Sequence, residues 1–144
     1  MASQSDWTDY AGSWSAVSAA GFTHDGGTYI SNMAGVTGFS HNAEWNVALS
    51  RGHIRDAVAA NEEFFLYFAG TMPHGPSVEN SLTATNGILL TPAGTLASAP
   101  VSGLPSRTDI LNFASTNGLN DRQLGTYVMD LALGALLEEV ETQG

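Results

Sequence analysis

One short apolar run constrains the fold of this chain more than any other feature. Phe64-Phe-Leu-Tyr-Phe-Ala69 is the longest fully apolar stretch in the sequence, and Gly70-Thr-Met-Pro-His-Gly-Pro76 follows it directly. The run is far shorter than the roughly 20 residues that a membrane span requires. Because it is rich in aromatic residues and does not alternate with polar ones, it predicts a strand buried on both faces, as in a parallel sheet.

A helix is predicted before this strand. Asn42 is a suitable N-cap for a helix that reaches about residue 60, and Glu44 then lies near the positive end of the helix dipole. Apolar residues cover a broad stripe of this helix, which suits packing on a sheet. Gly52 weakens the helix by about 1 kcal/mol relative to Ala, and it is a candidate point of close packing.

A second helix is predicted near residues 121–141. Asn120 and Gln123 resemble a capping box, and apolar residues recur at helical spacing as far as Val140. Residues 77–120 are rich in turn signals and are expected to form a long excursion with one short helix over 108–115. The order helix, strand, turn, excursion, helix favours an α/β fold with a parallel sheet.

Composition divides the chain into two parts. Residues 1–40 are rich in Gly, Ser, Ala and Thr and are expected to form loops with short strand pieces, whereas residues 41–144 carry the α/β pattern. The chain has no Cys, which excludes disulfides, Cys-based zinc sites and thiol nucleophiles. No secretory signal is visible, since a basic segment and a long apolar run are both missing at the start. The sequence therefore does not predict the cellular compartment.

The charge balance is strongly acidic. Four Arg and no Lys face 14 acidic residues, which gives a formal charge of −10. The arginines form no run, so we expect no nucleic-acid partner, and no membrane partner is indicated. A negative surface repels an anionic substrate unless a metal or a cluster of cations reverses the local field. Arg51 and Arg55 share one helix face, which we interpret as a solvated polar face.

His74 is the candidate functional residue. It follows the apolar run by a few residues, and ligands of open parallel sheets bind outside the carboxyl ends of the strands. Pro73 and Pro76 stiffen this turn. A histidine there can donate a hydrogen bond to an anion or protonate a leaving group, or it can merely bind a loop carbonyl. The pair His24-Asp25 and His41 are weaker candidates, because no second ligand stands at metal-binding spacing.

The strand region resembles a known family. Glu63-Phe-Phe-Leu-Tyr-Phe-Ala-Gly-Thr-Met-Pro-His-Gly-Pro76 is similar to the P-F-F-L-Y … P-H-x-P segment of type I sulfatases, in the alkaline-phosphatase-like superfamily. The helix after Asn42-Ala-Glu-Trp45 and residues 127–140 resemble flanking helices of that family in the same order. The resemblance covers about residues 40–144, so residues 41–144 would be a partial sulfatase-like domain.

The resemblance implies an internal fragment of a parallel-sheet catalytic domain that hydrolyses sulfate esters. It implies that His74 lines the sulfate-ester pocket and contacts the sulfate or the leaving oxygen. It also implies that Asp130 is a structural acid on the late helix, paired with the packing residue Gly134. Calcium and formylglycine would serve the full-length protein, whose substrate is a sulfate ester. Family members are often exported or lysosomal.

The chain departs from the family at the catalytic residues. Formylglycine arises from Cys or Ser in a C/S-x-P-S-R signature, but Gly103-Leu-Pro-Ser-Arg107 has Gly at that position and lies after the histidine segment. We interpret it as a turn followed by a short helix. An Asp-Asp pair near the start and an Asp-His-Gly after the last helix are also missing. We therefore expect no cofactor in this chain, no sulfatase activity from it alone, and no tight calcium binding.

Three hypotheses remain. The leading one is a sulfatase fragment, the second is a non-catalytic binding or interaction module with a sulfatase-derived fold, and the third is an unrelated small α/β domain. A helix–strand–helix piece leaves strand edges and apolar faces uncovered, so self-association or marginal stability is expected unless residues 1–40 cover them.

Overall fold

The computed structural model describes residues 15, 17–24, 41–73, 75, 77–91 and 94–143. Residues 17–19 are helical. The later elements are α2 (Ala43–Ala60), α3 (Val78–Thr83), the 3-10 helix η2 (Gly87–Leu89), β1 (Leu90–Thr91), β2 (Gly94–Thr95), α4 (Arg107–Thr116) and α5 (Asp121–Gln143). Most of the segment 1–40, where short strand pieces are predicted, lies outside the described residues.

The helix α2 begins and ends where the sequence predicts. The Asn42 side chain accepts a hydrogen bond from the Trp45 backbone N–H at 2.9 Å, and Asn61 ends the helix in the left-handed conformation. Asn42 is fully buried, and its Nδ2 donates to the carbonyls of Ile88 and Leu90 at 2.8 and 2.9 Å. One side chain therefore caps α2 and also attaches its start to η2 and β1.

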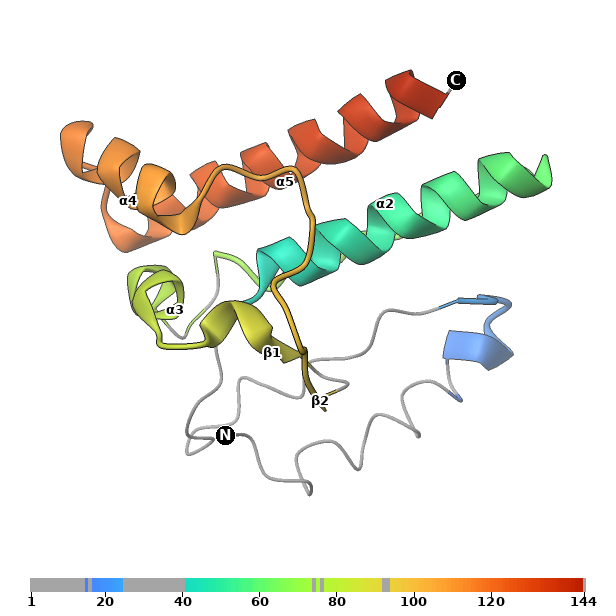
Figure 1. The fold of residues 1–144 in the computed structure, drawn as a ribbon, viewed down its shortest axis with the longest axis horizontal. Helices are drawn as coiled ribbons and strands as arrows, with labels where there is room; N and C mark the ends of the chain where they lie inside the picture. The colour runs from blue at the N-terminus through green and yellow to red at the C-terminus, as the bar shows by residue number, and fades with distance from the viewer. Residues whose placement is uncertain are drawn as a thin grey trace.

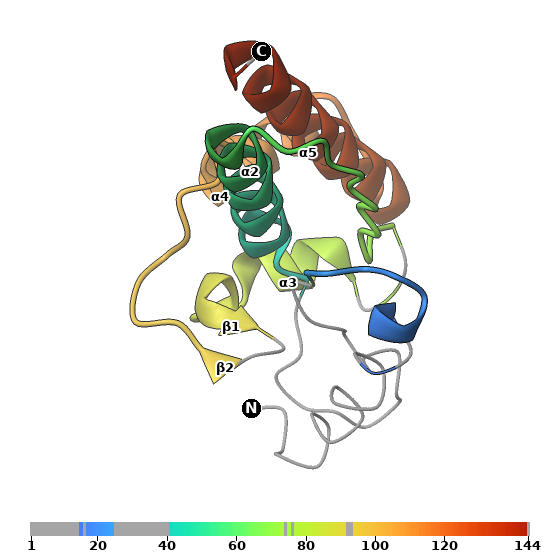
Figure 2. The same ribbon diagram turned by 90° about the vertical axis from the view of Figure 1, so that its right-hand side faces the viewer.

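The long helix α5 also confirms its prediction. The Gln123 backbone N–H donates to the Asn120 side chain, and the Asn120 backbone N–H donates to the Gln123 side chain, each at 3.0 Å. This reciprocal pair is the expected capping box. Figures 1 and 2 both show α5 lying alongside α2, and these two helices contact each other more extensively than any other pair of elements.

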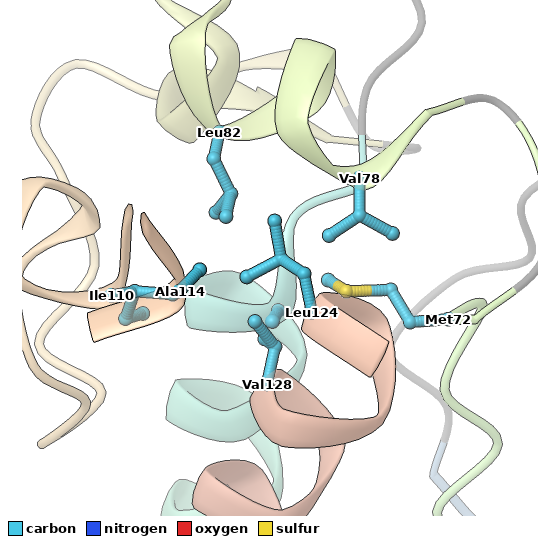
Figure 3. Packing of buried hydrophobic residues seen from close by; sticks show 8 residues of the cluster. Met72, Val78, Leu82, Ile110, Ala114, Leu124 and Val128 are labelled. Atoms are coloured by element: carbon cyan, nitrogen blue, oxygen red, sulfur yellow. The ribbon is translucent and has the colours of Figure 1, made fainter. Parts of the chain in front are cut away.

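Two buried clusters follow the length of α5. The first joins α3, α4 and the start of α5, and Figure 3 shows how its side chains converge; its buried members are Ala43, Met72, Val78, Leu82, Ile110, Ala114, Leu124 and Val128. The second lies between α2 and the remainder of α5; its buried members are Val47, Ile54, Ala132, Ala135 and Leu136. The helix pair therefore forms the frame on which the other segments pack.

The region between the two long helices holds more structure than predicted. The short helix predicted at 108–115 is present as α4, which begins at Ser106 as its N-cap. The helix α3 was not predicted; it is capped by the Ser77 hydroxyl, which accepts from the Asn80 backbone N–H at 3.3 Å. The strands β1 and β2 are antiparallel and very short, and the sheet that they form is the only one in the described part of the chain.

The predicted strand at residues 64–69 is not formed. Within the described part of the chain, the backbone of residues 63–70 makes no hydrogen bond, so there is no neighbouring strand to define a sheet. Hydrogen bonding to a neighbour is what makes a strand, and the sequence pattern alone does not supply it. The parallel sheet is thus absent from the described residues and remains part of the proposal below.

The segment 62–71 is nevertheless extended. It starts at the end of α2 and returns to the beginning of that helix, where Thr71 Oγ1 lies 2.6 Å from His41 Nδ1. The 18 residues of α2 span about 27 Å. Ten residues reach at most about 33–36 Å when fully stretched, so the returning chain must be largely extended. Figure 2 shows it as the green trace that leaves the end of α2 and passes α5.

Side chains of this segment alternate between two faces. Leu66 and Phe68 pack against the α2–α5 cluster, whereas Phe65 and Tyr67 are 78% and 72% exposed. The prediction of burial on both faces is therefore wrong for this chain. One face of the segment lies on the helices, and the other is an exposed aromatic surface.

Glycines in the two long helices have contrasting surroundings. A Cβ on Gly125 would lie 2.9 Å from Pro73 Cβ and 3.0 Å from Pro73 Cα, so the turn after the extended segment approaches α5 closely at this point. Gly52 and Gly134 have no described atom within 4 Å of such a Cβ. Close packing at Gly52 or Gly134, as interpreted from the sequence, is therefore not what the described residues show. None of the described helices is long and apolar enough to cross a lipid bilayer.

We predict opposite effects for alanine at two positions of α5. Gly125→Ala should destabilise the protein by about 1–2 kcal/mol, because the new methyl group meets the Pro73 backbone in a packed core. Gly134→Ala is the matched control and should stabilise it by roughly 1 kcal/mol, because only helix propensity changes. Urea unfolding followed by circular dichroism measures both. Equal stabilisation by the two substitutions would show that the turn does not pack against α5 as described.

Candidate functional site

The turn between the extended segment and α3 is the candidate site. His74 and Pro76 lie outside the described residues, so the predicted orientation of the His74 ring stays a prediction. Residues 71–73, 75 and 77 are described, with a cis peptide bond between Met72 and Pro73. The position of the turn is therefore defined by the contacts at its two ends.

A buried histidine holds the first end. His41 is 1% exposed, and its Nδ1 lies 2.6 Å from the Thr71 hydroxyl oxygen. Met72, the next residue, is buried in the first core cluster. The sequence treats His41 as a weak candidate for metal binding, but its described contact is with the turn. His41 therefore anchors the end of the extended segment beside the start of α2.

A carboxylate holds the second end. Asp121, the first residue of α5, accepts hydrogen bonds from the Ser77 hydroxyl and from the Glu79 backbone N–H, each at 2.9 Å. Partial burial is the largest single influence on Asp121 and opposes its ionisation, but the Glu79 and Val78 backbone, the Ser77 hydroxyl and the nearby His41 together hold its pKa below the ordinary value. The carboxylate also lies at the positive end of α3, where a negative charge is favourable. Both ends of the turn are thus fixed by residues distant in sequence.

Glu139 forms the main ionic contact between α2 and α5. It is only 2% exposed and accepts hydrogen bonds from Arg51 Nε at 2.6 Å and from Arg55 Nε and Nη2, both at 2.7 Å. The Arg55 hydrogen bond is the largest influence on this carboxyl group, and with Arg51 it lowers the pKa of Glu139 to about 2. The interpretation of Arg51 and Arg55 as a solvated face therefore holds only in part, because the Arg55 side chain is 49% exposed but both arginines bind the buried Glu139.

A second buried ion pair fixes the start of α4. Arg107 donates to both oxygens of Glu44, at 2.6 and 2.9 Å, and to the Ser81 carbonyl at 2.8 Å. Gly103, four residues earlier, has a positive φ of 82° and lies against the Arg51 guanidinium. Residues 103–106 are irregular rather than the predicted turn, whereas the predicted short helix is present as α4, and its Arg107 has a structural contact.

The described residues do not fit a calcium site. They contain no group of three or more His, Asp or Glu side chains that could hold a metal ion. They do bring together two histidines that the sequence treats separately, since the rings of His24 and His53 have centroids 5.3 Å apart. Sequence spacing gives no signal for this pair, because the two residues meet only after the segment 17–24 packs beside α2.

Asp130 does not have the structural contact expected from the resemblance. It is exposed on α5, and its side chain makes no hydrogen bond or ion pair with the described part of the chain. Gly134, its expected packing partner, faces open space there. A structural role for Asp130 is therefore not supported by its described surroundings.

No protein-family model, curated protein or solved structure matches this chain. The resemblance to type I sulfatases therefore rests on the motif residues quoted above.

We predict an acid-dependent loss of stability through Glu139. A carboxyl group whose pKa is lower in the folded state than the ordinary 4.5 stabilises the fold above that pH, and this stabilisation is lost as the pH falls towards about 2. Glu139→Gln should be less stable than the wild type at pH 7, and the difference should shrink steadily below about pH 4.5. Urea midpoints measured between pH 7 and pH 3 test this.

The exposed neighbour Glu138 provides the matched control for this experiment. Glu138→Gln removes the same charge without touching either arginine, so its urea midpoints should follow the wild-type profile. A Glu139→Gln profile that stays parallel to the wild type down to pH 3 would contradict the role of this carboxylate.

Proposed function

We propose that this chain is the central part of a sulfatase-like α/β hydrolase domain, and that the complete domain hydrolyses sulfate esters. The observation that carries the proposal is the extended segment 62–71. Within the described part of the chain, its backbone is unpaired over residues 63–70, and it leads directly into the Pro73-His74 turn. A central strand of a parallel sheet would have these properties if its neighbouring strands came from other parts of a longer protein.

The packing of the segment supports this proposal. In a parallel α/β sheet, helices cover both faces. Here α2 and α5 cover the face that carries Leu66 and Phe68, while Phe65 and Tyr67 project from the opposite face into solvent. Large exposed aromatic side chains on an otherwise packed segment indicate a surface that another layer covers. A second helical layer of the complete domain would fill that role.

The exposed side of α5 supports the same reading. Leu133, Leu137 and Val140 recur at helical spacing and are all exposed. Residues at i, i+4 and i+7 lie on one face of a helix, so the three side chains form an apolar stripe. Together with the aromatic face, this stripe is additional surface that the remainder of a larger domain would bury.

The chemistry proposed for this chain is limited to His74. The two ends of its turn are held by the contacts of His41 with Thr71 and of Asp121 with Ser77. A histidine at the carboxyl end of a strand can donate a proton to the leaving oxygen of a sulfate ester, or hydrogen-bond the sulfate. Calcium and formylglycine would supply the electrophilic and nucleophilic chemistry, but the described residues fit neither.

A non-catalytic interaction module is the alternative proposal. Gly103 at the position that imitates the modified residue favours it, because glycine has no Cβ to oxidise. The exposed Phe65 and Tyr67 would then form the contact surface. The catalytic proposal requires that this chain belong to an active enzyme, whereas the interaction module does not.

The catalytic proposal predicts the effect of His74→Ala in a complete sulfatase domain that contains this chain. Turnover of a chromogenic aryl sulfate should fall by roughly 10²–10⁴-fold if His74 is the general acid, with little change in thermal stability. Arg122→Ala is the control, because Arg122 is exposed and has no described ion-pair partner, and it should leave turnover unchanged. Unchanged turnover after His74→Ala would remove the catalytic role. A reading frame that lacks an upstream C/S-x-P-S-R signature would favour the interaction module.

The present chain alone should show no sulfatase turnover and no tight calcium binding. The reason is the missing nucleophile signature and the missing acidic metal ligands. An aryl sulfate assay with and without a chelator tests this expectation. Turnover that the chelator abolishes would show that this chain carries a complete active site.

Self-association should depend on the aromatic face. Phe65→Lys combined with Tyr67→Lys should shift the chain towards monomer in sedimentation velocity, because the double substitution places charge on the apolar surface. Ser115→Lys, an exposed position on α4, is the control and should have little effect. Equal association of the double variant and the wild type would exclude this face as the contact surface.

A further inference from the structure

We propose that His24 and His53 together bind a divalent transition-metal ion, for which Zn²⁺ is the representative. His24 ends the described segment 17–24, and His53 lies in the middle of α2. Their ring centroids are 5.3 Å apart and the ring planes are inclined by 52°. This proposal does not depend on the proposed sulfatase function.

The ring of His53 carries a nitrogen atom whose hydrogen-bonding capacity is unsatisfied. His53 Nε2 is buried and has no hydrogen-bond partner in the described part of the chain. Buried polar side-chain atoms are nearly always paired, and an exception points to a water molecule or an ion at that position. A neutral imidazole nitrogen is also the commonest metal ligand among side chains. The orphaned nitrogen and the adjacent imidazole therefore have a common explanation in a shared metal ion.

The separation of the His24 and His53 rings suits a shared zinc ion. A zinc ion lies about 2.0–2.1 Å from a ligating nitrogen, so the ring centroid is roughly 3 Å from the metal. Two rings bound at the tetrahedral angle then have centroids about 5 Å apart. The observed 5.3 Å agrees with this value. A direct hydrogen bond between the two rings would also satisfy His53 Nε2, but the described contacts contain none.

Packing alone, without a metal, brings His24 close to His53. Phe22, two residues before His24, contacts the Phe65 ring with centroids 6.2 Å apart. His24 Nδ1 lies 3.0 Å from the Thr23 hydroxyl, which leaves its Nε2 available as the ligand. A hydrogen bond to one ring nitrogen is the usual way in which the orientation of a metal-binding imidazole is set. Both rings are therefore already close to the positions that shared metal binding requires.

The ligand type selects the metal. Imidazole nitrogens suit zinc, copper and nickel, whereas calcium and magnesium take oxygen ligands. Two protein ligands leave the remaining coordination positions open to water or to another group. The acidic character of the chain favours the approach of a cation. Binding would join the segment 17–24 to α2 and so stabilise the folded state.

The test uses the full chain after treatment with a chelator. Isothermal titration with Zn²⁺ should show one ion per chain, and zinc should raise the melting temperature. His24→Ala and His53→Ala should each weaken zinc binding by at least about 10-fold, since losing a ligand costs no less than losing its supporting contacts. Glu138→Gln, an exposed position on α5, is the control and should leave zinc affinity unchanged. An excess of Ca²⁺ should not compete.

The zinc titration can overturn the proposal that His24 and His53 bind a metal ion. If zinc does not bind the wild type, or if it binds both single variants as tightly as the wild type, these histidines are not the ligands. Displacement of zinc by Ca²⁺ would indicate diffuse binding to acidic side chains instead. If His53→Ala unfolds, as circular dichroism would show, His24→Ala decides the question, because His24 is exposed and its loss leaves the core intact.

Discussion

The contact between α2 and α5 is the constraint on which the remainder of the structure depends, and a buried carboxylate fixes its register. Glu139 binds both Arg51 and Arg55, so neither helix can slide along the other without leaving a buried charge unpaired. Arg51 also donates to the Ser102 carbonyl at 2.8 Å, which attaches the chain before α4 to the same point. The extended segment 62–71 then lies against a helix pair whose geometry is already set.

Local signals in the sequence predicted the helices, because a cap needs only residues a few positions apart. Asn42 and the pair Asn120–Gln123 made the starts of α2 and α5 readable. The strand prediction failed for the opposite reason, since a strand exists only through a neighbour that the described chain does not provide. The contacts of Glu139 have no local signal in the sequence, because its arginine partners are more than 80 residues away.

The candidate sites divide in the same way. The Pro-His-Gly-Pro turn was visible in the sequence because its stiffness and its place after an apolar run are local properties. Its supports were not visible, because His41 and Asp121 reach it only through the fold. The His24–His53 pair also needs the tertiary structure, since α2 and the segment 17–24 must pack together before either ring has a neighbour. Paired side chains from distant segments are therefore what sequence reasoning misses here.

The arginine contacts affect which ligands the acidic surface of this chain can attract. Three of the four arginines bind buried carboxylates, so they neutralise interior charge and leave most of the acidic surface uncompensated. A sulfate ester carries a negative charge and would be repelled by such a surface. If the complete domain hydrolyses sulfate esters at the His74 turn, as proposed above, it would need cations from outside this chain to offset that repulsion. A cation such as Zn²⁺ faces no such barrier, and the same field that opposes sulfate favours its approach to His24 and His53.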